Sequence, residues 1–576
     1  VRGSDWGADQ KVVRMFVDTA PKAIRELASW GVPWNRVQRG VHEVVINGQR
    51  VTITEKEGAH GLISARNFGG TKHWRASFVS DGTGHSMLYT MSDQAIAQNI
   101  PVHERMEAMS LIHDSHKCYG AIARNLMTGE LVAYTAQATC MATGGFGRIY
   151  RVSTNAIINE GMGAAIALET GVTPLGNMEA VQFHPTAIFP AGILVTEGCR
   201  GDGGVLLDKS EHRFMPDYEP EAMELASRDV VSRRMEQHIK SGKAHSTRFG
   251  DHLWLDIRLL GEKHINGQLR EVKEICEYFL GINPAHQLIP VRPAQHYSMG
   301  GIRTNYRGES LGLIGLFAVG EAACWDMHGF NRLGGNSVAE AVVAGMIVGE
   351  FIADFCESDR GKSSFSSALV SAAWRDQEQL LQRLAKNPRG ENPYQLIREM
   401  QNIMTDKVGI FRDGDALEQA IIELRLLLVR SARVGIGRSV LGANPELVAA
   451  YRLPRMLKLA LSVAQGALAR TESRGAHFRK DYPRRNDRDW LCRTLAYWPD
   501  AQSTGVQLSY EQLAVDQMEL PPGWRGYGAR DYIDSLDTNA RQQEIDSVLA
   551  AIPEADRYAR QEALMPYQDL LPQKYR

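Results

Sequence analysis

Histidine, arginine and glutamate side chains gather in five short, glycine-rich segments of the chain. The segments are VQFHPTAI with His184, LVTEGCRGDGG with Thr196, Glu197 and Arg200, ELASRDVVS with Arg228, RPAQHYSMGG with His296, and HGFNRLGGNS with Arg332. Any single one is typical of a hydrogen-bonded histidine or a surface ion pair. Together they offer donors for both ends of a dicarboxylate, because guanidinium groups orient carboxylates through paired hydrogen bonds. A glutamate three residues before an arginine, with a second arginine elsewhere, also suits a proton relay.

Glycine turns at the ends of two predicted strands favour a nucleotide-binding sheet. ATGGFGR (142–148) follows one strand, and GLFAVGEAA (315–323) contains a second strand that ends at Gly320-Glu321. Such glycines let the backbone approach a ligand closely. No strand leads into GxGxxG with an acidic residue about 20 positions later. Either the fold is not a dinucleotide fold, or its first βαβ unit precedes Val1.

The elements that must position these segments change character along the chain. Apolar residues from Val12 to Trp30 recur at helical intervals, and HEVVINGQRVTITEKEG predicts a hairpin that turns at Asn47-Gly48. Residues 118–150 predict two strands joined at Thr128-Gly129, followed by a buried strand, ATCMA. Residues 184–296 are loop-rich. Helices are predicted over Leu417–Arg433 and Leu447–Ala469, and the composition becomes irregular after about residue 489.

Composition excludes several classes of protein. The chain has 576 residues, enough for roughly three to five domains, and 65 Lys plus Arg balance 67 Asp plus Glu, which argues against a nucleic-acid binder. Seven cysteines without a CxxC pair fit neither a disulfide scaffold nor a zinc or iron–sulfur site, so no metal is expected. No apolar stretch reaches the length of a spanning helix. Membrane attachment is therefore expected only through a partner.

The five segments, in this order and spacing, resemble the flavoprotein subunit of fumarate reductases and succinate dehydrogenases. The likeness extends to FGGTKHWRASFVSDGTGHSML near the front and ARTESRGAHFRKDYPRRND (469–487) near the back, so that it covers nearly the whole chain. It implies an α/β fold: a Rossmann-like FAD-binding domain with an inserted α+β capping domain, then a helical domain and a C-terminal segment. The implied boundaries are 1–183 and 297–358 for the FAD-binding domain, 184–296 for the capping domain, 359–490 for the helical domain and 491–576 for the C-terminal segment. The N-terminal βαβ unit is expected before Val1.

The resemblance also assigns site residues. It places the flavin against Thr83, Thr143, Gly144, Gly145, Gly320, Glu321 and Ser337. It places the two carboxylates of fumarate or succinate against His184, Thr196, His296, Arg332 and Phe68. Arg228 matches the proton-donating arginine of the family, with Glu197 and Arg200 as its relay to solvent. The implied reaction is hydride transfer from reduced flavin to one alkene carbon of fumarate while Arg228 protonates the other.

Cofactor, partners and location follow from the same resemblance. The cofactor is FAD; no RSH attachment segment is present, so the histidine of a covalent link is expected upstream of Val1. NEG replaces the usual GDG, which weakens the assignment of Glu160 as a flavin contact. The expected partners are an iron–sulfur subunit and one or more membrane anchor subunits that bind quinone, with no nucleic acid. The subunit is expected on the cytoplasmic side of the inner membrane.

Several alternatives stay open. Succinate dehydrogenases use the same site in the reverse direction. L-aspartate oxidases share the HPT and ESRG motifs but carry a glutamate where this chain has Phe68, which offers no charge to an ammonium group. A non-catalytic electron-transfer component could keep the fold, although every carboxylate-binding residue is retained. Cys199, beside Arg200, is either a perturbed thiol or an ordinary buried cysteine.

Overall fold

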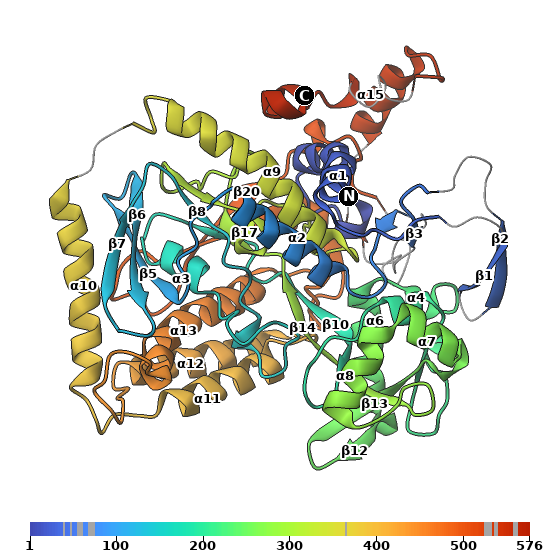
Figure 1. The fold of residues 1–576 in the computed structure, drawn as a ribbon, viewed down its shortest axis with the longest axis horizontal. Helices are drawn as coiled ribbons and strands as arrows, with labels where there is room; N and C mark the ends of the chain where they lie inside the picture. Colours follow the sequence, from blue (N-terminus) through green and yellow to red (C-terminus); the bar gives the residue numbers. More distant parts are fainter. Residues whose placement is uncertain are drawn as a thin grey trace.

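The computed structural model describes residues 1–37, 41–46, 49–54, 61–66, 75–362, 366–523, 533–534, 539–556 and 563–576. Its first long helix, α1 (Gln10–Trp30), begins where the Asp9 carboxylate accepts hydrogen bonds from two backbone N–H groups and ends at Gly31, whose φ is 114°. It packs against α9 (Asn336–Glu357) in the middle of the molecule (Figure 1). The helix predicted from the spacing of Val12 to Trp30 is confirmed.

Two antiparallel units follow α1 along the chain. The predicted hairpin is confirmed as β1 (Val41–Ile46) paired with β2 (Gln49–Thr54), while its turn, Asn47-Gly48, lies outside the described residues. After α2 (Thr83–Ala97), a meander of β5 (Met106–His113), β6 (Cys118–Asn125) and β7 (Leu131–Thr135) lies beside α10 (Ser367–Ala385). Gly129 makes the predicted turn with φ 85°.

The third predicted strand of this region differs from expectation in its burial. It is β8 (Thr139–Met141), which pairs in parallel with β16 (Leu316–Ala318). Met141 is buried, but Cys140 is exposed, so the prediction of a buried strand is wrong for that residue. The physical reason is that β8 has only β16 as a sheet neighbour within the described ranges.

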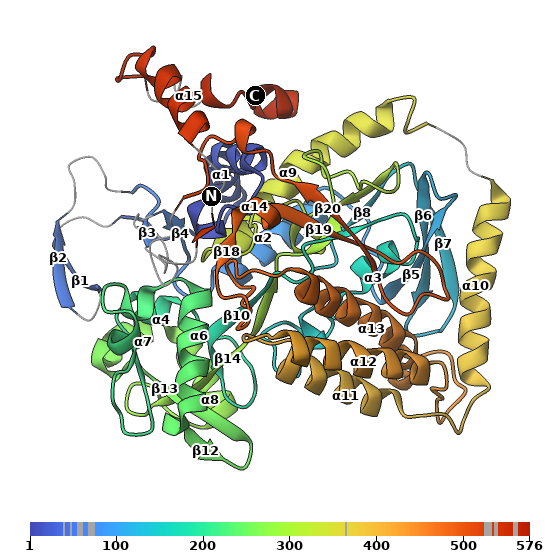
Figure 2. The same ribbon diagram turned by 180° about the vertical axis from the view of Figure 1, so that it is seen from behind.

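A five-stranded sheet joins distant parts of the chain. Its order is β17 (Ala323–Cys324), β15 (Gly301–Arg303), β9 (Leu175–Gly176), β19 (Cys492–Tyr497) and β20 (Gln507–Gln512). Most of these strands have only two or three residues, so the sheet is stabilised mainly by what packs on it. Figure 2 shows β19 and β20 next to the buried helix α13 (Pro445–Ala469). The C-terminal part of the chain is thus built into the body.

Residues 181–298 form a second unit with its own antiparallel sheet, called the cap below. Its order is β10 (Val181–Ile188), β14 (Ile289–Ser298), β13 (Gly250–Asp256) and β11 (Val205–Leu207), with β12 (His245–Thr247) beside β13. Its helices are α4 (Gly198–Gly201), α5 (Met215–Tyr218), α6 (Arg228–His238), α7 (Glu262–Gln268) and α8 (Arg270–Leu280). A separate apolar core runs from Ile188 to Val291, and the unit stands apart as the green lobe of Figure 1.

Helices α10, α11 (Pro393–Lys407), α12 (Gly414–Ser431) and α13 form the helical region. Asn392, Asp413 and Asn444 accept N-terminal hydrogen bonds, which explains where three of them begin. The two predicted helices match α12 and α13. Helix α13 is buried on all sides, since residues in every register from Leu447 to Ala467 are inaccessible. It is therefore a core helix and not an amphipathic one.

The predicted fold class is confirmed: an α/β body with an α+β insertion, followed by helices and a C-terminal segment. The numbered domain boundaries stay a prediction. The remaining helices are α3 (Met162–Leu168), α14 (Asp487–Trp490) and α15 (Asn539–Ala550). In the described part of the chain, no helix combines the length and the apolar character needed to cross a membrane.

Candidate active site

A buried ion pair lies at the start of helix α6. Nε of Arg228 donates to Oε2 of Glu197 over 2.7 Å, and the two side chains are only 9% and 1% exposed. Glu197 stands immediately before α4, so this pair connects two helices of the cap. Charge-assisted bonds of this kind hold a guanidinium in one orientation. Nη1 of Arg228 is buried without a hydrogen-bond partner among the described residues, so it can donate to a ligand.

Two histidines face each other across neighbouring strands of the cap. The rings of His184 on β10 and His296 on β14 have centroids 4.8 Å apart. Nδ1 of His184 accepts the backbone N–H of Thr186 over 3.2 Å, so a neutral ring must carry its proton on Nε2. That Nε2 is buried and has no partner in the ranges described. Nδ1 of His296 lies 2.7 Å from Oγ1 of Thr154.

Both histidines are held neutral. Burial lowers the pKa of His184 well below its ordinary value, and the positive charge of Arg228 lowers it further. Burial likewise lowers the pKa of His296, with Arg332 and Arg228 as the next causes. Protonation of either ring would place another cation among arginines. A neutral His184 can therefore donate a hydrogen bond from Nε2, which suits a carboxylate.

Arg332 is a second buried arginine close to Arg228 and His296. It is buried, its guanidinium carbon lies 4.5 Å from the centre of the Tyr297 ring, and its Nε has no partner among the described residues. Burial and the charge of Arg228 lower the pKa of Arg332 to about 9. An arginine with so low a pKa lacks a counter-ion at bonding distance. A bound anion would supply one.

Arg200 lies in the same short helix that follows Glu197. It is 1% exposed and donates from Nη1 to the backbone oxygen of Glu224, while its Nε and Nη2 have no partner in the described part of the chain. Burial lowers the pKa of Arg200, although the charge of Glu197 acts in the opposite direction. The structure thus brings together the three residues predicted to relay the proton.

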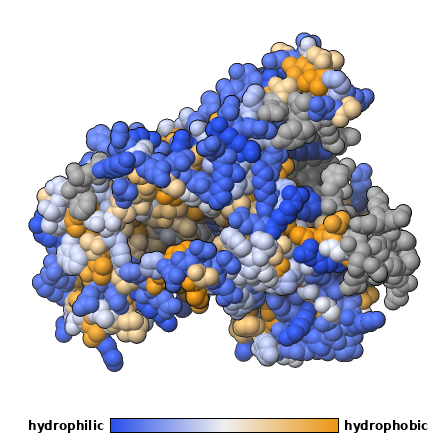
Figure 3. Space-filling model, turned by 45° about the horizontal axis from the view of Figure 1, so that its top comes forward, coloured by the Kyte–Doolittle hydropathy of each residue, from blue (hydrophilic) through white to orange (hydrophobic). Residues whose placement is uncertain are grey.

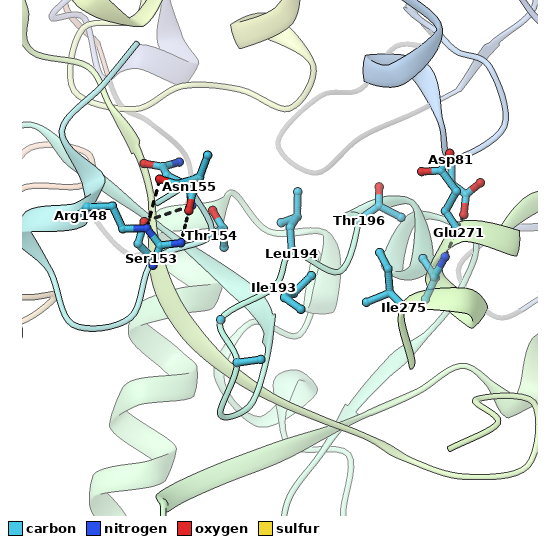
Figure 4. Close-up of a pocket in the computed structure, with 14 residues that line it drawn as sticks. Asp81, Arg148, Ser153, Thr154, Asn155, Ile193, Leu194, Thr196, Glu271 and Ile275 are labelled. Carbon is cyan, nitrogen blue, oxygen red and sulfur yellow. Dashed lines mark hydrogen bonds between the residues drawn. The ribbon is translucent and has the colours of Figure 1, made fainter. Parts of the chain in front are cut away.

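Thr196 lies at a cavity of about 380 Å³ between the cap and the body. Figure 4 shows Thr154 and Thr196 on opposite sides of this cavity, with Ile193 and Leu194 between them. Thr154, which lines the cavity, bonds the ring of His296, so the histidine pair lies directly behind this part of the cavity wall. Phe68, the fifth predicted substrate contact, lies outside the described residues.

Five of the seven predicted flavin residues fall on two adjacent loops. Because β8 and β16 pair in parallel, the loops that follow them lie at one edge, which brings Thr143, Gly144 and Gly145 near Gly320 and Glu321. A Cβ at Gly145 would stand 2.4 Å from Oε1 of Glu321, so only glycine fits there. Oε1 of Glu321 accepts the N–H of Ser298 over 2.8 Å. Burial raises the pKa of Glu321 to about 7.

These loops suit FAD on physical grounds. Gly144 and Gly320 have φ of 72° and 60°, a conformation that lets backbone groups face a planar ligand without side chains in between. Ser337 lies in the first turn of α9, a 22-residue helix with no side-chain cap at its N-terminus. Its free N–H groups favour negative charge, such as that on a reduced flavin. Figure 3 shows a hollow on the left half of the molecule, the half that holds β8 and α3 in Figure 1.

The structure also shows where three other residues singled out from the sequence lie. Thr83 is the first residue of α2, where its Oγ1 accepts the N–H of Val79 over 3.0 Å. Glu160 forms an ion pair with Arg452 over 2.8 Å, so its carboxylate has a partner within the protein and needs no contact with a flavin. Cys199 is fully buried, and burial raises the pKa of its thiol well above the ordinary value, so it is an ordinary buried cysteine.

Sequence reasoning missed a buried hydrogen-bond network beside His296 and Arg332. The hydroxyl of Tyr297 donates to Oε2 of Glu340 over 2.9 Å, and Nε2 of His328 lies 2.8 Å from the same oxygen. These residues hold the Tyr297 ring against which Arg332 lies. Tyr297 and His328 stand beside His296 and Arg332 in the HYSMGG and HGFNRLGG segments, and that proximity was the available signal.

Comparison with known proteins covers both halves of the chain. A family model described as an FAD binding domain matches residues 1–338, and one described as the fumarate reductase flavoprotein C-terminal region matches residues 397–527. The fumarate reductase flavoprotein subunit of Helicobacter pylori is 50% identical, with 100% of this chain and 84% of that protein covered. The mitochondrial succinate dehydrogenase flavoprotein subunit of rice is 35% identical, with 92% and 82% covered.

Solved structures agree with the sequence relatives. The quinol fumarate reductase of Escherichia coli superimposes with a TM-score of 0.82 at 36% identity, over 92% of this chain and 88% of that one. This chain and the E. coli protein therefore share one fold over most of their length.

Proposed function

This chain belongs to the family of flavoprotein subunits of fumarate reductases and succinate dehydrogenases, and from that premise we propose that it reduces fumarate to succinate within a membrane-associated quinol:fumarate reductase. It is an FAD-dependent oxidoreductase of that family. One observation carries the proposed substrate. Three buried donor atoms, Nε2 of His184, Nη1 of Arg228 and Nε of Arg332, have no partner among the described residues. Buried donors without acceptors are costly, and a ligand with two carboxylates would supply the acceptors.

The predicted carboxylate-binding residues would contact different parts of the substrate. Arg332, His184 and His296 would hold one carboxylate, with Thr196 at the other end of the substrate and Phe68 along its side. Fixed donors of this kind polarise the alkene more strongly as negative charge develops in the transition state than they do in the ground state. The mutual repulsion between Arg228 and Arg332 supports this assignment, because an anion relieves it.

Arg228 would donate the proton. FAD, held by Thr143, Gly144, Gly145, Gly320, Glu321, Ser337 and Thr83, supplies a hydride equivalent when it is bound and reduced. An arginine is a weak acid, with an ordinary pKa above about 12. It can act only if carbon becomes basic as the proton moves and a neighbour restores the charge at once. Glu197, in contact with Nε of Arg228, is placed to do so, and Arg200 would reload Glu197.

Direction and electron supply are set by partners. Electrons would arrive through an iron–sulfur subunit, and one or more quinone-binding anchor subunits would hold the complex on the cytoplasmic side of the membrane. Fumarate reduction is favoured over succinate oxidation by the relatives: the bacterial fumarate reductase subunit of H. pylori is 50% identical, against 35% for the rice succinate dehydrogenase subunit. The purified complex tested with both couples would decide between them.

Replacing Arg228 tests the proposal. In the purified complex, Arg228→Ala should abolish fumarate-dependent oxidation of reduced benzyl viologen while the flavin absorbance stays unchanged. Arg234→Ala, on the same helix and in a partly exposed pair with Glu219, is the matched control for loss of an arginine. Substantial turnover in Arg228→Ala would refute the role. Aspartate-dependent peroxide formation by the wild type, without fumarate reduction, would favour an amino-acid oxidase instead.

A further inference from the structure

A second, smaller cavity lies on the cap behind α4. Its volume is about 30 Å³, and its lining residues are Arg200, Gly203, Gly204, Arg213, Glu221, Ala222, Met223, Glu224 and Leu225. It shares no lining residue with the 380 Å³ cavity. A space of this size exceeds the roughly 10–15 Å³ that one water requires. Arginine and glutamate side chains provide the polar partners that a water needs to stay there.

The inner end of this small cavity is the guanidinium of Arg200. That side chain is 1% exposed, and the atoms Nε and Nη2 have no hydrogen-bond partner among the described residues. Nη1 is fixed by the backbone oxygen of Glu224, so the guanidinium cannot turn away from the cavity. A buried donor of this kind needs an acceptor, and the cavity wall holds one in the carboxylate of Glu224.

The outer end of the cavity is a pair between Glu224 and Arg213. Nη2 of Arg213 donates to Oε2 of Glu224 over 2.6 Å, and Nε donates to Oε1 over 3.0 Å. The side chain of Glu224 is 4% exposed, whereas that of Arg213 is 39% exposed and Glu221 is exposed beside it. Accessibility therefore rises stepwise from Arg200 through Glu224 to the surface of the cap.

We propose that this cavity is the proton inlet of the site, with Glu224 as the residue that passes protons from solvent to Arg200. The inference rests on the proposed reduction of fumarate. Each turnover adds one hydride equivalent from the reduced cofactor and one proton from bulk water, which gives succinate. The proton leaves Arg228 for carbon, Glu197 restores Arg228, Arg200 restores Glu197, and a water between Arg200 and Glu224 restores Arg200.

A separate inlet has a functional consequence. Because the two cavities have no lining residue in common, protons can reach Arg200 through the small cavity while a dicarboxylate occupies the site formed by His184, Arg228 and Arg332. Glu224 touches neither substrate nor cofactor and is a positioning and relay residue. Its removal should therefore slow the proton step without weakening substrate binding.

Two variants of the intact complex test the inlet. Glu224→Gln keeps the shape and removes the charge; Ala222→Leu fills the cavity and removes no charge. Both should lower kcat for fumarate reduction at least about tenfold, leave KM within about twofold, and raise the solvent deuterium isotope effect on kcat. Glu224→Asp should recover part of the rate. Asp217→Asn, an exposed cap carboxylate that does not line the cavity, should behave as wild type.

Three results would overturn the inlet. The first is kcat and an isotope effect within about twofold of wild type in folded, flavin-loaded Glu224→Gln and Ala222→Leu. The second is a rise in KM with unchanged kcat, which would make Glu224 a purely structural support of the cap. The third is wild-type activity in Ala222→Leu if Glu224→Gln does not fold. A wild-type complex that reduces no fumarate at all would instead refute the proposed function beneath it.

Discussion

Raising the pH above about 9 should weaken the binding of dicarboxylates, because Arg332 then loses its proton in the free protein. Burial, with the positive charge of Arg228, lowers the pKa of Arg332 to about 9. A bound carboxylate stabilises the charged guanidinium, so the pKa rises in the complex. Between these two pKa values, binding must take up one proton. Well above pH 9 the dissociation constant then increases about tenfold for each pH unit. Because half of the free Arg332 is already deprotonated at pH 9, the increase from pH 9 to pH 11 is about 50-fold, or about 2.3 kcal/mol.

Four other groups of the site keep their charge over this interval. The pKa values of His184 and His296 are lowered well below 6.5 by burial, so both rings are neutral throughout. Burial raises the pKa of Tyr297 well above 10. Glu321, with a pKa raised to about 7 by burial, is already ionised above pH 9. Burial also lowers the pKa of Arg200, so the slope of affinity against pH is assigned to Arg332 by its loss in Arg332→Gln.

The assay is a titration of the flavin absorbance of the complex with malonate between pH 8 and pH 11 at constant ionic strength. Malonate has two carboxylates but no pair of adjacent methylene carbons to oxidise. The matched control is Arg332→Gln, which should bind weakly and with no slope. A flat affinity in the wild type would refute the depressed pKa of Arg332. A slope that survives in Arg332→Gln would assign the proton to another group.

Three further predictions concern the framework. Arg233 donates from α6 to the backbone oxygen of Gly475 over 2.8 Å; Arg233→Gln should loosen the cap and raise KM for fumarate severalfold, as steady-state kinetics would show. Arg470 pairs with Glu179 over 2.8 Å, and both side chains are fully buried. Arg470→Gln should lower the free energy of unfolding by about 3–5 kcal/mol and lower Tm. An unchanged Tm would contradict this. Leu424 is fully buried in the main core. Leu424→Ala should lower the free energy of unfolding by about 2–5 kcal/mol, as thermal unfolding with flavin bound would show.

Elements specified by local patterns could be predicted from the sequence. Helix α1 follows from its apolar spacing between Asp9 and Gly31, which act at its two ends in the way these residue types favour. The turn at Gly129 follows from a residue type that tolerates positive φ, and the pairing of β1 with β2 follows from two strand-like runs close together in the sequence. The order of the sheet that joins β9 with β19 could not be predicted, because its strands are short and about 320 residues separate them.

The residues of the site also divide into those that a local sequence pattern reveals and those that depend on the fold. His184, Glu197 and Arg228 stand in segments whose composition singles them out, and the family resemblance assigned their roles. Glu224 could not be found in this way: it is one of several acidic residues between Asp217 and Asp229, and nothing in its neighbours indicates burial. Burial of that carboxylate depends on Arg213 and on the fold of the whole cap.

The contacts between the two ends of the chain impose an order on its biosynthesis. Asp5 bonds Arg485, 480 residues away, and also the N–H of Gly475, which packs on Phe330 beside Arg332. At about 5–20 residues per second, a ribosome needs roughly 24–96 s to make that interval. For this period the N-terminal segment has no partner at the C-terminal end, and the loop that carries Arg332 lacks its support. The support of the Arg332 loop is therefore complete only after synthesis has passed residues 475–485.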